Sequence, residues 1–152
     1  MNLGDIIKKE IIFFNLKAES REEVVEAIIK GMSEAGYISD TAQYLSAVRE
    51  RESKGTTGIG YGVAIPHGKS DAVVRPCLAF ARLEKPVEWN SFDGKPVHNV
   101  FLIGVPTANA GNDHLKILIA ISKMLMHDDF RDALDRAKTS EEILSLLASI
   151  NS

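Results

Sequence analysis

The chain has 152 residues, of which 45% are hydrophobic and 26% are charged, and its net charge at pH 7 is −3. This composition is typical of one globular domain, which we expect to span residues 1–152, and its acidic balance argues against nucleic acid binding. The sequence shows no signal peptide, and no stretch approaches the roughly 20 apolar residues that a membrane span needs, so we expect a cytoplasmic protein without direct membrane insertion.

The first part of the chain predicts a short strand followed by two helices. Residues 11–14 form an apolar run of strand length. Ser20 and Glu23 have the spacing of a capping box, and apolar residues recur at helical spacing behind them as far as Gly36, a helix-terminating residue. A second helix is expected from residue 40 to about residue 54.

The last part of the chain predicts two strands and three helices. The expected strands cover residues 77–83 and 97–105, and the expected helices cover residues 112–127, 129–137 and 140–150. The first of these helices has little polar face, so we expect it to be buried. Thr139 and Glu142 form a second capping box. These elements predict an α/β protein, a three-layer α/β/α sandwich with a mixed sheet of four or five strands and helices on both faces.

A glycine-rich stretch, residues 58–68, holds the strongest candidate for chemistry. Residues 63–65 are apolar and predict a short buried strand that stops at Pro66, because proline cannot donate to a central ladder. His67 is therefore expected just past a strand end. Gly68, which has no side chain, is expected to let another molecule approach the ring. Histidine titrates near neutral pH and is suited to nucleophilic or acid–base chemistry.

The residues around His67 favour an anion rather than a nucleotide or a metal. Thr56 and Thr57, with the glycine amides, are donors for an anion such as phosphate. Val63 replaces a glycine that a P-loop requires, and Ile65 replaces the third glycine of a dinucleotide fingerprint. None of the four histidines has paired metal-ligand spacing. The only cysteine, Cys77, lies in an apolar run and is expected to be a core residue that fits a reducing cytosol.

Several segments resemble the fructose/mannitol-type EIIA domains of the bacterial phosphoenolpyruvate-dependent sugar phosphotransferase system, and they are closest to the fructose type. The matching segments are residues 51–60, 62–68, 75–80, 86–89 and 112–118. Beyond these segments, the resemblance extends over nearly the whole chain. Tyr61 is a departure, because an acidic or polar residue is common there in the family.

The resemblance implies a phosphotransferase that works through a phosphohistidine. The Nε2 atom of His67 would accept a phosphoryl group from the phosphocarrier protein HPr and pass it to a cysteine of the EIIB domain, serving the membrane permease EIIC indirectly. No nucleotide, metal or organic cofactor is implied. Arg51 would join the site, because its planar fork can bind two phosphate oxygens at once. His114 would be the third member, since it lies in the first turn of its helix, where an anion is favoured.

Two other functions stay open. One is a regulatory EIIA of the nitrogen-related branch, which receives phosphate but signals by binding other proteins. The other is a non-enzymatic module that merely holds an anion near His67. The run over residues 111–118 is closer to the fructose type, so we prefer sugar transport. The sugar is recognised by EIIB and the membrane partner, and this chain therefore carries no signature of it.

Overall fold

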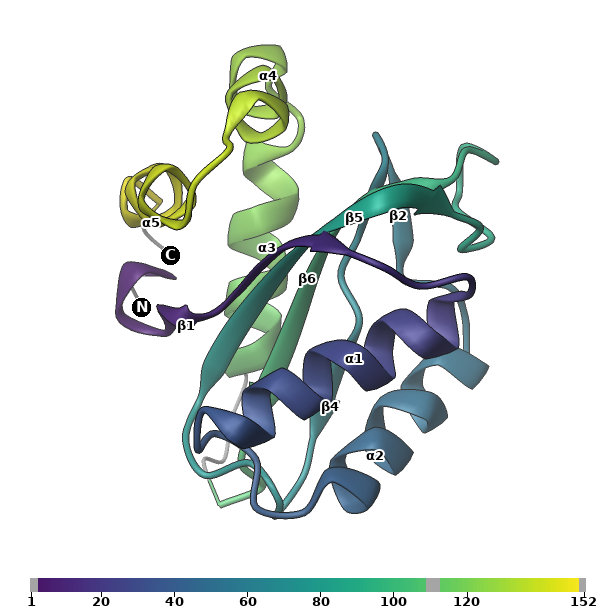
Figure 1. Ribbon diagram of the computed structural model, residues 1–152, viewed down its shortest axis with the longest axis vertical. Helices are drawn as coiled ribbons and strands as arrows, with labels where there is room; N and C mark the ends of the chain where they lie inside the picture. The colour runs from purple at the N-terminus through teal and green to yellow at the C-terminus, as the bar shows by residue number, and fades with distance from the viewer. Residues whose placement is uncertain (1–2, 109–112, 151–152) are drawn as a thin grey trace.

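Figure 1 shows the computed structural model, which describes residues 3–108 and 113–150 and, for residues 113 and 114, the backbone alone. A short 3₁₀ helix (Leu3–Asp5) comes first. The other elements are β1 (Ile7–Leu16), α1 (Arg21–Glu34), α2 (Thr41–Ser53), β2 (Gly58–Gly60), β3 (Val63–Ala64), β4 (His67–Lys69), β5 (Cys77–Val87), β6 (Val97–Val105), α3 (Asp113–Met124), α4 (Asp128–Arg136) and α5 (Ser140–Ala148). The predicted α/β sandwich with a mixed sheet is confirmed. None of the described helices is long and apolar enough to span a bilayer.

The sheet has six strands in five positions across its width. Its order is β1-β5-β6-β3-β2, and β4 also pairs with β6. Strands β3 and β4 run one after the other along β6, both parallel to it, because the chain resumes the same ladder after a short break. The remaining pairs are β1 with β5, which is parallel, and β5 with β6 and β2 with β3, which are antiparallel. The predicted width of four or five strands therefore agrees with the structure.

Helices α1 and α2 cover one face of the sheet (Figure 1). Both begin where the sequence predicts, because local side chains satisfy their first amides. The hydroxyl of Ser20 accepts from the amide of Glu23 at 3.2 Å, and Asp40 Oδ1 accepts from the amide of Gln43 at 3.1 Å. The apolar residues of the two helices then pack in one core with the sheet. The main helical members of that core are Val24, Val25, Ile28, Ile29, Met32, Tyr44 and Val48.

The other face carries α3, α4 and α5, which pack on the aromatic pair Phe80 and Phe101. The prediction that α3 is buried is wrong for part of its surface. Ile117 and Ile121 are fully buried, but Leu115 is 43% exposed and Ile119 is 53% exposed. In the described part of the chain α3 packs on the sheet from one side, so its outer apolar side chains face solvent.

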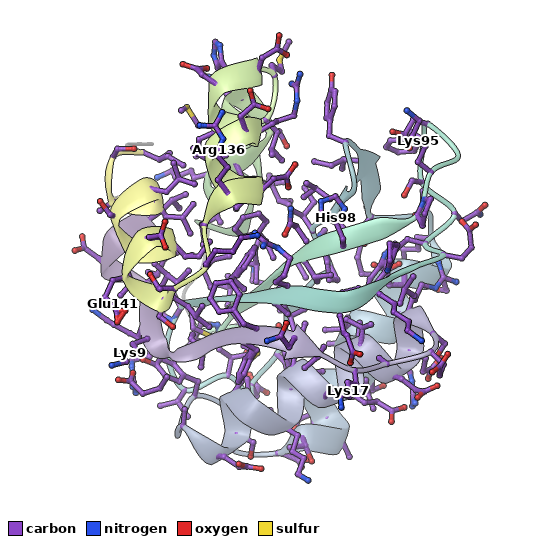
Figure 2. All side chains as sticks on the ribbon, turned by 45° about the horizontal axis from the view of Figure 1, so that its top comes forward. Lys9, Lys17, Lys95, His98, Arg136 and Glu141 are labelled. Carbon is purple, nitrogen blue, oxygen red and sulfur yellow. The ribbon has the colours of Figure 1, made fainter. Side chains whose placement is uncertain are left out.

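Polar contacts fasten the outer helices to the sheet. Arg82 of β5 donates to the carbonyl oxygen of Leu134 at 2.6 Å, and thereby satisfies the last turn of α4. His98 of β6 lies with its Nε2 atom 3.0 Å from a carboxylate oxygen of Asp135, which gives this histidine a structural contact. His98 is labelled in Figure 2, which draws the described side chains as sticks.

Candidate functional site

His67 is the first residue of β4 rather than a loop residue after a strand. Strand β3 ends at Ala64, one residue before the predicted end, and the chain pairs with β6 again directly after Pro66. The carbonyl oxygen of Pro66 accepts from the amide of Ile103 at 3.1 Å, and His67 then lies opposite Ile103 in the parallel register. Proline supplies an acceptor although it has no donor, so it permits the ladder to restart. The prediction that His67 lies outside a strand was wrong, and its backbone is fixed by the sheet.

The ring of His67 is oriented by its own backbone. Its Nδ1 atom lies 3.1 Å from the carbonyl oxygen of Ile65. A carbonyl oxygen only accepts, so Nδ1 must carry the hydrogen and the lone pair of the neutral ring lies on Nε2. The side chain of His67 is partly exposed. This arrangement suits a nucleophile that reacts at Nε2.

Gly68 serves the packing of α2 against β4. A side chain added at Gly68 would place its Cβ 3.0 Å from Cγ2 of Val48 and 3.1 Å from Cε1 of Tyr44. Gly68 is buried by this contact. The expectation that it opens the imidazole to an approaching molecule is therefore wrong. The same helix is also anchored to β6, since the Tyr44 hydroxyl donates to the carbonyl oxygen of Ile103 at 2.7 Å.

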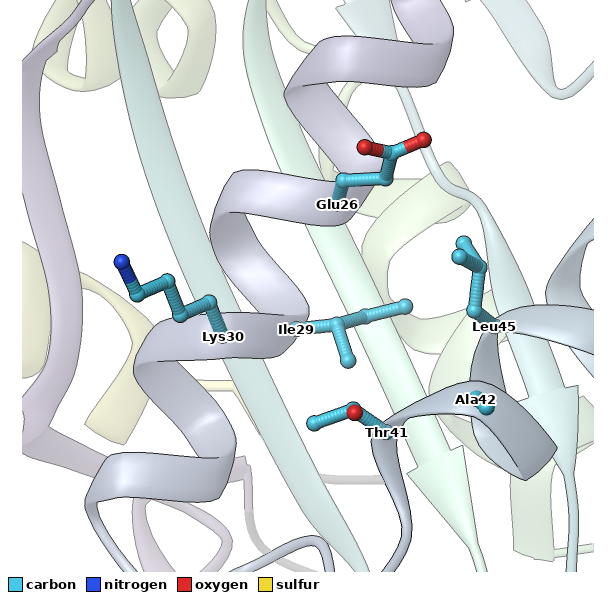
Figure 3. A pocket seen from close by; sticks show the side chains of 6 residues that line it. All are labelled: Glu26, Ile29, Lys30, Thr41, Ala42 and Leu45. Atoms are coloured by element: carbon cyan, nitrogen blue, oxygen red, sulfur yellow. The ribbon is translucent and has the colours of Figure 1, made fainter.

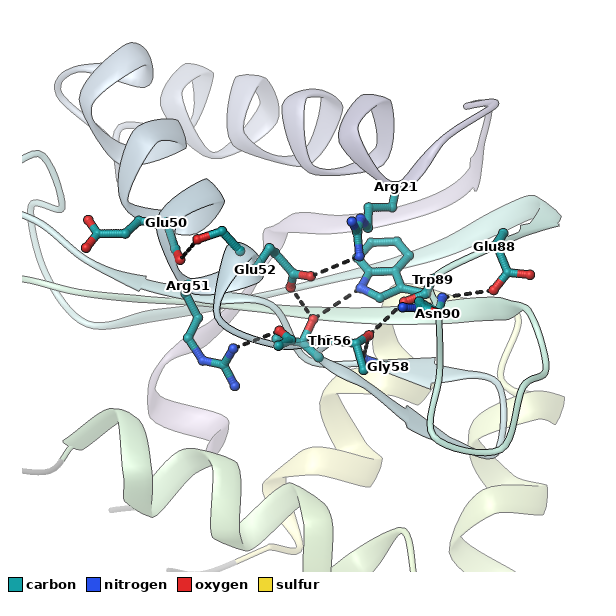
Figure 4. Close-up of polar contacts among 12 residues, drawn as sticks. Arg21, Glu50, Arg51, Glu52, Thr56, Gly58, Glu88, Trp89 and Asn90 are labelled. Carbon is teal, nitrogen blue, oxygen red and sulfur yellow. Dashed lines mark hydrogen bonds and ion pairs between the residues drawn. The ribbon is translucent and has the colours of Figure 1, made fainter.

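Arg51 lies in the last turn of α2, on the face that packs against β4. It follows Val48 by three positions, and residues three apart share one side of a helix. Val48 packs against Gly68, the residue after His67, so Arg51 lies on the side of α2 that faces β4, and its place in the site stays a prediction. Its NH1 group donates to the carbonyl oxygen of Gly55 at 2.9 Å, which fixes the direction of the guanidinium (Figure 4).

The hydroxyl groups of Thr56 and Thr57 hold the loop that follows α2. Thr56 Oγ1 donates to the carbonyl oxygen of Trp89 at 2.7 Å and accepts from the amide of Gly58 at 3.0 Å. Thr57 Oγ1 donates to a carboxylate oxygen of Glu52 and accepts from the indole Nε1 of Trp89 at 3.1 Å. The role of both threonines as phosphate ligands stays a prediction. In this structure their hydroxyl groups donate to the Trp89 carbonyl oxygen and to the Glu52 carboxylate.

Glu52 is a residue that sequence reasoning missed. Its place in a run of charged residues suggested a solvated helix end, yet its side chain is only 10% exposed. No pattern in the sequence pointed to Glu52, because its ion-pair partner Arg21 lies in another helix. Trp89 is fully buried.

The third predicted member, His114, is placed by its backbone alone. It is the second residue of α3, so the prediction that it lies in the first turn of a helix is confirmed. Its side chain lies outside the described residues. So does residue 112, one of the two predicted caps.

The remaining polar groups of the described chain give no second reactive centre. Among the residues that the structure describes, no three His, Cys, Asp or Glu side chains are grouped to hold a metal ion. Burial raises the pKa of the Cys77 thiol to about 12, while a hydrogen bond at Gly104 and the charge of Arg75 lower it in part. Cys77 is therefore an inert thiol at neutral pH, as its place in an apolar run predicts.

A groove of about 430 Å³ lies between α1 and α2 (Figure 3). None of the predicted site residues lines it. Its lining residues are Glu26, Ile29, Lys30, Thr41, Ala42 and Leu45. The site around His67 is thus separate from this groove.

The chain matches a known protein family over almost its full length. The model for "Phosphoenolpyruvate-dependent sugar phosphotransferase system, EIIA 2" matches residues 5–150. Among curated proteins, the fructose-specific EIIA component of Haloferax volcanii is 37% identical over 149 residues, which are 98% of this chain and 96% of that protein. The nitrogen regulatory protein of Bradyrhizobium diazoefficiens is 36% identical, over 97% of this chain and 95% of that protein.

Other relatives are much longer than this chain. The fructose-specific EIIABC component of Bacillus subtilis is 35% identical over 147 residues, and the chain spans only 23% of its length. Among solved structures, nitrogen regulatory protein IIA-Ntr from Neisseria meningitidis superposes with a TM-score of 0.85 at 30% identity, covering 95% of this chain and 97% of that one. Enzyme IIA mannitol from Escherichia coli, at 23% identity and a TM-score of 0.76, shares the fold over 92% of this chain and 97% of its own.

Proposed function

This chain belongs to the EIIA 2 family of the phosphoenolpyruvate-dependent sugar phosphotransferase system, and on that premise we propose that His67 is the residue that carries the phosphoryl group. One observation supports this assignment above the others, namely the 3.1 Å contact between Nδ1 of His67 and the carbonyl oxygen of Ile65. It fixes the tautomer whose lone pair lies on Nε2. The partly exposed ring then presents its nucleophilic atom without any cofactor.

The reaction is a pair of phosphoryl transfers. Nε2 of His67 attacks the phosphorus atom of phospho-HPr, and the bond between phosphorus and the donor atom breaks while its electron pair stays with the donor. A cysteine thiolate of EIIB then attacks the same phosphorus atom, and the electron pair returns to Nε2. Charge spreads over the three equatorial oxygens in each step, so fixed donors supply most of the rate. Arg51 and His114 are the proposed donors.

Helix α3 offers a docking surface next to the site. Strand β6 passes His67 at Ile103 and ends at Val105, and α3 then runs back along the sheet (Figure 1). Its early exposed residues, Leu115 and Ile119, form what we name the α3 strip. Contiguous exposed apolar residues mark protein contact sites. We assign the α3 strip to HPr and EIIB in turn, and through EIIB to the membrane permease EIIC, with the protein acting in the cytoplasm.

The test is reconstitution of the relay. The chain is incubated with phosphoenolpyruvate, enzyme I and HPr, and mass spectrometry then follows an acid-labile phosphate. We expect one phosphoryl group on His67 and its transfer to a fructose-type EIIB. Absence of phosphate would favour a simple anion-binding module and overturn the proposal.

A regulatory function is the second candidate, because the Bradyrhizobium nitrogen regulatory protein is almost as similar as the fructose-specific relative. The same assay separates the two. Phosphorylation of His67 without onward transfer to any fructose-type EIIB would support regulation over transport.

A further inference from the structure

Glu52 joins four separate segments around the end of α2 (Figure 4). One carboxylate oxygen accepts from the hydroxyl of Thr57, and the other lies 3.7 Å from NH1 of Arg21, the first residue of α1. The hydroxyl of Thr57 in turn accepts from the indole of Trp89 at 3.1 Å. A single carboxylate therefore connects α1, α2, the loop after α2 and the segment after β5.

The same loop is held by the residue next to Glu52. Arg51 donates to the carbonyl oxygen of Gly55 at 2.9 Å, while Glu52 binds Thr57 two positions further on. Thr56, which lies between Gly55 and Thr57 in the chain, donates from its hydroxyl to the carbonyl oxygen of Trp89. The path of the loop thus determines where the Gly55 carbonyl stands, and that carbonyl determines the direction of the Arg51 guanidinium.

The arrangement is poorly suited to a purely stabilising role. Burial raises the pKa of Glu52, against the hydrogen bond from Thr57 and the charges of Arg21 and Arg51, which lower it. One of its oxygens, Oε2, is buried without a hydrogen-bond partner among the described residues. A buried ion pair is often no better for stability than well-packed apolar residues, whereas it does fix geometry.

We propose that Glu52 is a positioning residue for phosphoryl transfer, which holds the loop over residues 54–57 through Thr57 so that Arg51 stays aimed at the phosphoryl group on His67. The inference rests on the proposed function of His67 and adds a residue to it. Glu52 itself does not touch the reacting atoms.

The experiment compares single and double variants with two phosphoryl donors. Transfer to His67 is timed from phospho-HPr and from phosphoramidate, a small donor that needs no protein docking. Glu52→Ala is expected to slow both reactions on the order of 10- to 100-fold, because small misplacements of a positioning group cost rates of this size. Glu52→Gln, whose amide oxygen still accepts from Thr57, is expected to recover part of the loss.

A double-mutant cycle tests whether Glu52 acts through Arg51. In an Arg51→Ala background, Glu52→Ala is expected to cause no further loss of rate, because the group that it positions is gone. An equal loss in both backgrounds overturns the inference. Glu50→Ala is the matched control, since Glu50 is an exposed carboxylate two positions away that pairs with Lys54 at 3.6 Å, and its rates should equal those of the wild type.

A structural readout separates misplacement from unfolding. Trp89 is the only tryptophan, so its fluorescence reports on the Thr57 contact, and an altered emission in a folded Glu52→Ala protein is expected. Where Glu52→Ala does not fold, Thr57→Val breaks the same link and takes its place. If the wild type accepts no phosphate on His67, the proposed function fails and this inference fails with it. If the wild type reacts normally and the folded Glu52 or Thr57 variants keep its rate, only this inference is overturned.

Discussion

Nδ1 of His67 and the backbone carbonyl oxygen of Ile65 lie 3.1 Å apart. The residue between them is Pro66, whose fixed backbone angle holds this short turn, and His67 is tied to β6 on its other side. The ring is therefore oriented by the backbone of the short connection between β3 and β4. The contact is made to a main-chain atom, and it leaves the lone pair of the neutral ring on Nε2.

The first prediction is that the phosphate is carried on Nε2 of His67. His67→Ala should take up no phosphoryl group from phospho-HPr and should remain folded, because its partly exposed side chain contributes little to the core. Phosphorus–nitrogen NMR on the phosphorylated wild type locates the bond. His98→Ala is the control, and it should accept phosphate normally. A phosphate on Nδ1, or on another histidine, would contradict the assignment.

Arg51 is predicted to stabilise the phosphoryl group in transit. Removing one preorganised donor slows such chemistry ~10²- to 10³-fold, so Arg51→Ala should lose a factor of this size. Arg51→Lys should also be slow, because it keeps the charge but loses the planar fork. Rapid-quench measurements of transfer from phospho-HPr give these rates.

Arg49→Ala serves as the control for Arg51. Arg49 is half exposed and pairs with two residues of α1, Glu22 at 2.5 Å and Glu26 at 3.2 Å. Exposed pairs of this kind contribute about 1 kcal/mol or less to stability. Transfer by Arg49→Ala should match the wild type, and equal rates for Arg51→Lys and wild type would rule out a role for the fork.

His114 is predicted to donate a hydrogen bond to the phosphoryl group. At a helix start the positive end of the dipole opposes a second positive charge, whereas a phosphate on His67 would favour one. NMR titration of the histidines should therefore show the midpoint of His114 moving upward after phosphorylation. An unmoved midpoint, together with normal transfer by His114→Ala, would exclude this role.

The helix starts were predictable because their hydrogen bonds are local in sequence. The capping pairs Ser20–Glu23 and Thr139–Glu142 are each three residues apart, and both helices begin beside them. The strand β4 was missed because three residues carry no periodic pattern of their own. Its pairing is set by β6, more than thirty positions later in the chain. The exposure of α3 was missed for a related reason, since it depends on what packs against the helix.

The predictions for the candidate site show the same difference between local and long-range contacts. The motif around His67 identified the candidate for the reactive residue, and that role stays a prediction. The role expected for Gly68 was wrong because its contact comes from Val48 in another element. Glu52 could not be identified from the sequence, because its contacts involve residues in distant segments. It pairs with Arg21, and its partner Thr57 accepts from Trp89. Contacts between such segments have no signature in a single sequence.

The fourth prediction concerns stability at alkaline pH. Burial raises the pKa of Cys77 to about 12, against a usual value of 9.0, and raises the pKa of Tyr44 well above 10.0, with the charge of Cys77 adding to the effect. Above pH 9 the unfolded chain releases the Cys77 proton while the folded chain keeps it. Unfolding is therefore favoured as pH rises, and the loss continues to about pH 12.

Denaturant titrations at several pH values measure this loss. Each group should reduce the free energy of unfolding by about 1.4 kcal/mol per pH unit in its window. Cys77→Ala should give a shallower decline between pH 9 and 11 than the wild type, with Tyr44 accounting for the remainder. A wild-type stability that stays flat over this range would show that these groups are not held protonated.

The last prediction tests the α3 strip as the docking surface for HPr. Ile119 is 53% exposed, and a carboxylate placed there would have to be desolvated on docking, so Ile119→Asp should slow transfer from phospho-HPr about 10-fold or more. Transfer from phosphoramidate should stay unchanged, because that donor does not dock.

Phe92→Asp is the matched control for the α3 strip. Phe92 is 76% exposed, so it is at least as accessible as Ile119. It lies beyond the end of β5, where its amide donates to the carbonyl oxygen of Gly58 in β2 at 3.0 Å, so Phe92 belongs to a different element from the α3 strip. Its variant should react at the wild-type rate with both donors. If Ile119→Asp slowed transfer from both donors equally, the substitution would be affecting the chemical step, and the assignment of the α3 strip as a docking surface would be wrong.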